Sequence, residues 1–211
     1  IKSSKIDLFE DETINILKKN NKIEGVECLN LGKIKSKVVI LTTGTFLNGM
    51  IYYGNETREA GRIGNSSSKE LAKFINKNFK TMRLKTGTPP RIYSRSINYD
   101  ILEPQRSENN GIFLSYFTKQ NTNKHINCFI TKTNNKTHRI IRENLHKSAM
   151  YSGTIKSQGV RYCPSIEDKI TKFGDRNGHN IFLEPEGLNS DLVYPNGISN
   201  SLDKSIQLRF L

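Results

Sequence analysis

Short runs of apolar residues, separated by polar turns, dominate the chain and predict strands more often than helices. Residues 6–9 are a short strand candidate, and residues 13–17 and 22–29 predict a hairpin across the polar turn at 18–21. Residues 38–41, Val-Val-Ile-Leu, form an unbroken aliphatic run, which is typical of a strand buried on both faces inside a parallel sheet. This pattern favours a chain built around a sheet.

Two segments show the periodicity of a helix packed on one face. Apolar residues recur over residues 71–75, after serines at 66–68 that are candidate N-caps. A second helix is predicted over residues 137–147, where the apolar positions form one stripe. His138 and His146 point to roughly the same side of that helix, but no carboxylate completes a ligand set. We therefore expect solvated histidines rather than a metal site.

Strand candidates and helix candidates both occur along the chain. Further strand candidates lie at residues 128–130 and 179–183. Polar residues dominate from residue 94 to about residue 157, so this stretch is expected to be an insertion carried by a larger sheet domain.

Three loops are rich in small or cationic residues. Residues 42–45 would let a ligand approach the end of the 38–41 strand, although a tight turn is the simpler interpretation of that segment alone. Residues 61–68, Gly-Arg-Ile-Gly-Asn-Ser-Ser-Ser, could hold a phosphate at a helix start, but they match neither the P-loop nor GxGxxG spacing. In residues 83–91, two prolines exclude helix and a glycine permits a bend. Such a rigid loop with cations and hydroxyls favours function over a linker.

A candidate reactive cysteine lies in residues 159–169. Cys163 stands next to a proline between Arg161 and Lys169, and nearby cations stabilise a thiolate. Taken alone, the stretch fits a surface turn before a helix at least as well, with Cys163 as a small buried apolar residue.

Charge and composition narrow the classes of function. The formal net charge of +13 favours an anionic partner such as nucleic acid or a phosphorylated cofactor, although lysines used for solubility explain it about as well. Hydrophobic residues make up 35% of the chain, and ten Phe and eight Tyr suffice for a core. The three cysteines lack ligand spacing, so we expect a reducing compartment without a structural zinc site. The sequence shows neither a membrane span nor a signal peptide.

Six stretches, taken in order, resemble the MnmG (GidA) family of flavin-dependent tRNA uridine carboxymethylaminomethyl-modification enzymes. They cover the chain almost from end to end and comprise residues 43–47, 61–64, 83–91, 161–169, 182–187 and 194–199. The resemblance implies the α/β fold class, as part of a Rossmann-like FAD-binding domain interrupted by an inserted mixed α/β domain. The expected segments are residues 1–92 (FAD-binding), 93–157 (inserted) and 158–211 (FAD-binding, with a nicotinamide-dinucleotide segment).

The resemblance also implies that the chain is a fragment. The family's N-terminal GxGxxG fingerprint does not occur in the sequence, and we expect a second functional cysteine and a C-terminal helical domain to be missing as well. Residues 1–211 alone are therefore expected to be poorly stable and inactive, because an incomplete sheet leaves an exposed edge.

The activity that the resemblance implies is modification of C5 of the wobble uridine of tRNA. A GTPase partner of the MnmE type, FAD, NADH and methylenetetrahydrofolate would take part, and the added group would be carboxymethylaminomethyl or aminomethyl. A cytoplasmic homodimer without membrane attachment is expected, or a mitochondrial one in a eukaryote. Two alternatives stay open: a folate- and FAD-dependent tRNA uridine methyltransferase, and a noncatalytic basic module that binds tRNA.

The resemblance assigns roles to individual residues. Cys163 would add to C6 of uridine, and Glu167 or Asp168 would move the proton that leaves C5. The expected flavin or substrate loop consists of Lys85, Thr86, Gly87, Thr88 and Arg91. The expected cofactor contacts are Thr13, Ser68, Gly159, Val160, Arg161, Tyr162, Cys163, Pro164, Ser165, Ile166, Glu167, Asp168, Lys169, Ile170, Thr171, Lys172 and Phe173.

Overall fold

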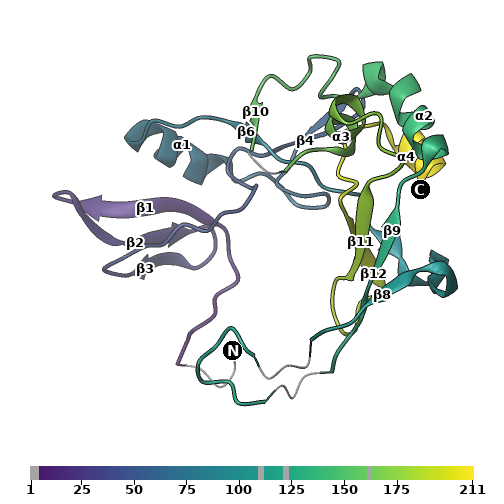
Figure 1. Cartoon of the computed structure of the whole chain (residues 1–211). Coiled ribbons are helices and arrows are strands. Elements are labelled where there is room, and N and C mark those ends of the chain that lie inside the picture. The colour runs from purple at the N-terminus through teal and green to yellow at the C-terminus, as the bar shows by residue number, and fades with distance from the viewer. Residues whose placement is uncertain (1–4, 109–111, 121–123, 161–162) are drawn as a thin grey trace. The chain divides into compact units, whose positions relative to one another are not determined.

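The computed structural model describes residues 5–108, 112–120, 124–160 and 163–211. The chain divides into two compact units (Figure 1). Unit 1 comprises Ile1–Tyr52 and Glu56–Arg83, and unit 2 comprises Tyr53–Asn55 and Leu84–Leu211. These bounds differ from those of the three expected segments, whose assignment to domains stays a prediction.

Unit 1 contains a small antiparallel sheet of three strands, β1 (Thr13–Lys19), β2 (Lys22–Cys28) and β3 (Gly32–Lys35). The predicted hairpin is confirmed. Its two turn residues, Asn20 and Asn21, both have positive φ, which asparagine tolerates and which a two-residue hairpin turn requires. Helix α1 (Lys69–Asn78) packs against β1 and buries Leu71 and Ala72, as its periodicity predicts (Figure 1).

Two strand predictions in unit 1 are wrong. Residues 6–9 are exposed and form no strand, and the aliphatic run at residues 38–41 is extended but unpaired. Val38 and Ile40 are 71% and 82% exposed. A buried parallel strand needs neighbours on both sides, and within the described ranges no strand pairs with this run. A short hairpin, β4 (Met50–Tyr53) and β5 (Glu56–Glu59), follows it.

Unit 2 is centred on a sheet with the order β7-β12-β11-β9-β8, in which all neighbours are antiparallel. The strands predicted at residues 128–130 and 179–183 are confirmed as β9 and β11. The strands are β7 (Ile92–Tyr93), β8 (Glu103–Gln105), β9 (Cys128–Lys132), β11 (Asn180–Pro185) and β12 (Leu192–Asn196). A separate parallel pair joins β6 (Leu84–Lys85) to β10 (Gln158–Gly159).

Three helices gather at one end of this sheet: α2 (Asn135–Glu143), α3 (Ile166–Lys172) and α4 (Lys204–Phe210) (Figure 1). Short 3-10 turns lie between β7 and β8, at Ser94–Ser96 and Tyr99–Ile101, and after α2, at Leu145–Lys147. The helices and β11 and β12 share one apolar core, in which Ile141, Ile166 and Leu202 are fully buried. Unit 2 therefore has its own hydrophobic centre, and α3 is anchored in it.

Helix α2 begins and ends earlier than the periodicity predicts, and the prediction about its histidines is half wrong. The side chain of Asn134 accepts a hydrogen bond from the Thr137 amide and so caps the helix at residue 135. The helix ends at Glu143, so His146 lies beyond it and is exposed. His138 lies one turn before Ile141 on the buried face and is only 1% exposed. It is a core residue, not a solvated one.

Candidate functional site

The parallel pair β6–β10 brings two predicted loops together in unit 2. Gln158 lies opposite Leu84 and Gly159 opposite Lys85, and the Val160 amide donates to the Lys85 carbonyl at 3.3 Å. A side chain on Gly159 would press on Lys85, because a Cβ there would lie 3.0 Å from Cε of the lysine. The Lys85 side chain therefore packs directly against the backbone at Gly159.

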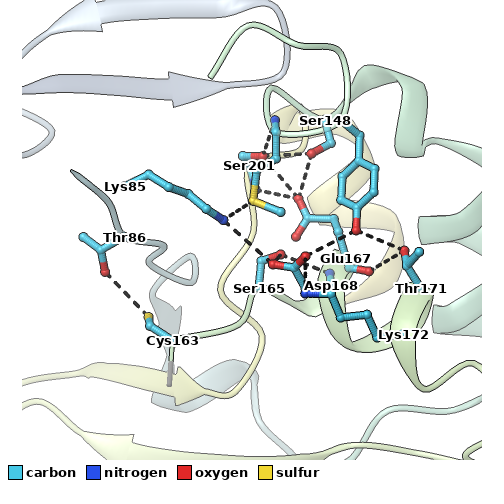
Figure 2. A network of polar contacts seen from close by, with 12 residues as sticks. Lys85, Thr86, Ser148, Cys163, Ser165, Glu167, Asp168, Thr171, Lys172 and Ser201 are labelled. Carbon is cyan, nitrogen blue, oxygen red and sulfur yellow. Dashed lines mark hydrogen bonds and ion pairs between the residues drawn. The ribbon is translucent and has the colours of Figure 1, made fainter. Parts of the chain in front are cut away.

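The thiol of Cys163 meets the Lys85 loop directly. Its sulfur lies 3.6 Å from Oγ1 of Thr86 (Figure 2). Cys163 is half-buried and precedes the Ser165 N-cap of α3 by two residues. The predicted neighbours Arg161 and Tyr162 lie outside the described residues. The structure thus unites the two stretches that the sequence singles out.

A cation does lie near this thiol. The Lys169 ammonium donates to the Gly197 carbonyl at 2.8 Å, which holds the side chain in place. Burial lowers the pKa of Lys169, whereas a negative charge on Cys163 acts in the opposite direction and raises it. Lys169 is therefore the described cation whose charge is coupled to Cys163.

Asp168, in the first turn of α3, is the centre of a polar network (Figure 2). Its carboxylate lies 3.8 Å from Nζ of Lys85 and 3.6 Å from Nζ of Lys172. The Tyr151 hydroxyl donates to it at 3.4 Å, and the Ser165 hydroxyl does so at 3.3 Å. Burial raises the pKa of Tyr151, which keeps this hydroxyl a proton donor. Lys85 also contacts the sulfur of Met150.

Glu167 has quite different surroundings, although it is the preceding residue. Its side chain is fully buried. Oε1 accepts hydrogen bonds from the Ser148 hydroxyl at 3.0 Å, the Ser201 amide at 2.8 Å and the Ser201 hydroxyl at 3.3 Å (Figure 2). Oε2 has no hydrogen-bond partner within the described part of the chain. Glu167 therefore ties α3 to two other segments of unit 2.

Residues 159–173, the expected cofactor segment, include both buried and exposed side chains. Ile166, Glu167 and Ile170 point into the core and are at most 1% exposed, so they support the segment from behind. The outward positions are Pro164, Thr171, Lys172 and Phe173, which are exposed. Whether any of these residues contacts a cofactor stays a prediction.

Arg91 fixes the far end of the Lys85 loop. Its Nε donates to Glu186 at 2.7 Å, its Nη1 donates to the Thr88 hydroxyl at 2.7 Å, and the guanidinium lies 4.6 Å from the centre of the Tyr194 ring. Gly87 fits closely against Ser199, since a Cβ there would lie 3.0 Å from Cβ of the serine. Arg91 thus holds this end of the loop against Glu186 and Tyr194, while the rigidity of the loop stays a prediction.

The other two predicted loops meet inside unit 1. Thr45 donates from its hydroxyl to the Gly61 carbonyl at 2.7 Å, and the Ser68 amide donates to the Phe46 carbonyl at 2.9 Å. Ser68 is the N-cap of α1, yet its side chain makes no capping hydrogen bond. Thr13 lies at the start of β1, with its hydroxyl 3.8 Å from the sulfur of Cys28.

Sequence reasoning missed several partners of the site. Ser148, Ser201, Tyr151 and Met150 are separated by 17 to 65 positions from the residues that they contact, and no local pattern marks them. Of these four residues, only Ser201 lies near a motif that the sequence analysis singles out, residues 194–199.

A buried histidine pair was also missed. The rings of His138 and His179 lie 5.3 Å apart, and Thr133 Oγ1 lies 2.7 Å from Nε2 of His138. Burial lowers the pKa of both histidines, because it disfavours the charged imidazolium.

No cluster of three or more His, Cys, Asp or Glu suited to a metal ion occurs among residues with a described position. Nor does any helix in those ranges have the length and apolarity to cross a membrane.

Comparison with known proteins extends over the full chain. Residues 1–211 match the model of the family described as glucose inhibited division protein A. The chain is 50% identical over 204 residues to the tRNA uridine 5-carboxymethylaminomethyl modification enzyme MnmG of Buchnera aphidicola subsp. Cinara cedri, covering 95% of this chain and 32% of that protein. It is 45% identical over 207 residues to the Aquifex aeolicus enzyme of the same name, covering 94% and 33%.

Solved structures agree with the fold. Aquifex aeolicus GidA in its form I crystal superposes with a TM-score of 0.77 at 46% identity, over 93% of this chain and 34% of that one. The form II crystal gives a TM-score of 0.75 at 42% identity, over 93% and 32%. The α/β fold class is thereby confirmed. The chain spans about a third of the length of the relatives it matches.

Proposed function

Since the chain belongs to the glucose inhibited division protein A family, we propose that it is part of a flavin-dependent enzyme that modifies the wobble uridine of tRNA. The added group is carboxymethylaminomethyl or aminomethyl, at C5. Methylenetetrahydrofolate supplies the one-carbon unit, and glycine or ammonium supplies the nitrogen. A GTPase of the MnmE type and a second copy of the chain complete the assembly. We place it in the cytoplasm, or in mitochondria for a eukaryotic source. The observation that carries the proposal is the meeting of Cys163 with Thr86, next to the ion pair of Lys85 and Asp168, in a chain 45–50% identical to proteins whose names state this activity.

Cys163 is the proposed nucleophile. Its thiolate adds to C6 of uridine, and the electron pair of the C5–C6 double bond moves towards the C4 carbonyl, which makes C5 nucleophilic. C5 then attacks the one-carbon electrophile. After a base removes the C5 proton, the C6–sulfur bond breaks and the double bond re-forms. The Thr86 hydroxyl, 3.6 Å from the sulfur, orients the thiolate.

The two carboxylates receive different roles in this proposal. Asp168 is the proton acceptor, because it lies at the edge of the site beside Lys85 and is 19% exposed. Glu167 is fully buried and accepts three hydrogen bonds on one oxygen, which suits a positioning residue. It holds the start of α3, and hence Asp168 and Cys163, against Ser148 and Ser201.

We assign the flavin to the unit 1 loops. α1 has ten residues, and the Ser68 side chain leaves the amides of its first turn without a side-chain acceptor, which suits a phosphate oxygen. A Cβ on Gly61 would lie 2.3 Å from the Phe46 ring, so the backbone there stays bare and close-packed. Residues 42–45 and 61–68 would hold FAD, with Thr13 further along the site. FAD supplies electron transfer when bound, with NADH as the reductant, and the outer face of residues 159–173 contacts the nicotinamide dinucleotide.

Two measurements on the purified intact protein test this function. A flavin absorption spectrum is expected, and mass spectrometry of nucleosides from treated tRNA should show a carboxymethylaminomethyl or aminomethyl group on the wobble uridine. A flavin spectrum with 5-methyluridine as product would instead identify the methyltransferase. A colourless protein with salt-sensitive RNA binding would identify a noncatalytic module.

A further inference from the structure

The exposed side of α2 and of the turn that follows it carries cations in series. Residues 135–147, all of which the structure describes, contain four Lys and Arg and one Glu. All four cations are exposed, and no large apolar side chain of this range is. Two further exposed cations border α2, one after the end of α3 and one at the start of α4. We call these six residues the α2 band: Lys136, Arg139, Arg142, Lys147, Arg176 and Lys204.

Contacts within unit 2 hold these cations around one helix. α2 packs against both α3 and α4 (Figure 1). Nη2 of Arg142 donates to the Gly174 carbonyl at 2.7 Å and so anchors α2 to the loop after α3. Hydrogen bonds within the first turn of α4 are the main cause that lowers the pKa of Asp203, and the charge of Lys147 adds to them. Lys147 therefore lies near the start of α4, where Lys204 follows Asp203.

Most positive charges of the band are not neutralised by the protein. Arg139 lies 4.0 Å from Glu143. In the described part of the chain, no ion pair joins another member of the band to a carboxylate. Asp175 and Asp203, next in sequence to two members of the band, are the other acidic residues beside it. Charge complementarity therefore favours an anionic partner on this surface.

The first turn of α2 shows that its cation does not serve the helix. Lys136 lies in this turn, which has no acidic residue and follows the neutral N-cap Asn134. The N-terminal end of a helix dipole is positive and favours anions. α1 and α3 follow that rule, with Glu70 in the first turn of α1 and two carboxylates, Glu167 and Asp168, in that of α3. Lys136 opposes the dipole of its own helix, and binding to an anion gives it a purpose.

We propose that the α2 band binds the phosphate backbone of a base-paired stem of the tRNA whose uridine reaches Cys163. This inference rests on the proposed function, which supplies the tRNA. α3 connects the two regions, because Cys163 precedes its start and Arg142 holds the loop after its end. Phosphates are bound by Lys and Arg alone, whereas unpaired bases are held on aromatic rings, and the band contains no aromatic residue.

Two other partners fit this surface less well. A protein interface has an apolar centre, and residues 135–147 expose no large apolar side chain that could form one. A dinucleotide carries its charge on a single pyrophosphate, which six cations spread over three helices would exceed. An extended polyanion matches both the number and the spread of the charges.

Binding of tRNA to the intact protein, measured by fluorescence anisotropy over a series of salt concentrations, tests the proposal. The band variant Lys136→Gln/Lys147→Gln/Lys204→Gln should bind tRNA at least about tenfold more weakly at about 0.1 M salt. Its slope of log affinity against log salt should be smaller by about two to three, since each neutralised phosphate contributes about 0.7–0.9. KM for tRNA should rise while kcat stays unchanged. Lys136→Arg/Lys147→Arg/Lys204→Arg keeps the charge and should bind like the wild type.

Two controls separate this surface from net charge and from damage to the fold. Lys33→Gln/Lys35→Gln/Lys37→Gln removes the same charge at exposed positions in unit 1 and should leave tRNA affinity unchanged. The band variant should unfold in urea at the same concentration as the wild type, because its three lysines are exposed and form no ion pair within the described ranges.

Equal tRNA affinity of the wild type and the band variant would overturn the proposal, and so would an equal loss of affinity in the unit 1 variant. Normal tRNA binding with a raised KM for NADH would also overturn it and identify a dinucleotide site. Normal tRNA binding with loss of the GTPase partner would do the same and identify a protein interface. A wild type that binds tRNA but modifies none would remove the proposed function, whereas weaker binding by the band variant would still support the α2 band.

Discussion

The sulfur of Cys163 lies 3.6 Å from the hydroxyl of Thr86, a residue 77 positions earlier in the chain. The parallel pair β6–β10 makes this contact possible, because each of its strands leads directly into one of the two loops. Lys85, at the end of β6, faces Asp168 in the same network. One short pairing thus assembles the thiol, the carboxylate and the cation of the candidate site.

Replacement of Cys163 tests the nucleophile. In the intact protein, Cys163→Ser should lower the rate of tRNA modification at least about 100-fold, since a positioned catalytic group contributes about 10²–10⁴-fold, while the flavin spectrum stays unchanged. Single-turnover assays with nucleoside mass spectrometry measure this rate. Cys128→Ser is the matched control, because that half-buried thiol lies on β9. Full modification by Cys163→Ser would exclude a covalent role.

Replacement of Asp168 separates proton transfer from binding. Asp168→Asn keeps the shape of the side chain but cannot accept the proton, so kcat should fall by about 10²–10⁴-fold while KM for tRNA changes little. The control is Asp175→Asn, an exposed carboxylate just after α3 that should leave kcat unchanged. A normal kcat for Asp168→Asn would transfer the role to another residue.

Glu167 should matter more for stability than for proton transfer. Glu167→Ala removes the acceptor of three hydrogen bonds and leaves the Ser201 amide buried without a partner. The free energy of unfolding should fall by about 2–4 kcal/mol, as measured by urea denaturation. Glu167→Gln keeps an acceptor oxygen and should cost less than the alanine variant. If both variants unfolded like the wild type, the hydrogen bonds to Ser148 and Ser201 would not hold α3.

The buried histidines should make stability depend on pH. Burial lowers the pKa of His138 and His179 in the folded protein, whereas the unfolded chain binds protons near pH 6.5. The unfolded state therefore gains protons first as pH falls below about 6.5. The free energy of unfolding should decrease there, by up to about 1.4 kcal/mol per pH unit for each histidine, until the folded pKa is reached.

Urea denaturation at pH 7.5 and pH 5.5 measures this decrease. His138→Gln does not titrate and can still accept a hydrogen bond from Thr133, so its stability should change less between the two pH values. His146→Gln, at an exposed position, is the matched control. An unchanged pH dependence in His138→Gln would show that the buried pair does not cause it.

Local patterns predicted much of the fold. The turn within residues 18–21, the helix after the serines at 66–68, and strands β9 and β11 all follow from residues within a few positions of each other. The sequence also singled out the two loops that meet at Cys163. Local patterns could not predict that these two loops meet, because Thr86 and Cys163 are 77 positions apart in the chain.

Burial was the part that the sequence predicted least well. The aliphatic run at residues 38–41 looks like a core strand, yet strand formation needs partners that a single segment cannot encode. Glu167 and His138 look like exposed polar residues of helices. Each is buried because hydrogen-bond partners from distant segments, Ser201 and Thr133, satisfy it.

The β6–β10 pair is shorter than the two strand pairs that β11 forms in the five-stranded sheet. Each strand contributes only two residues, supported by the bond from the Val160 amide to Lys85. Separation of such a pair costs far less than unfolding β11, which is paired on both sides. The Val160 amide should therefore exchange with deuterium much faster than the amides of β11. Thr86 and Cys163 can thus separate while the five-stranded sheet stays paired.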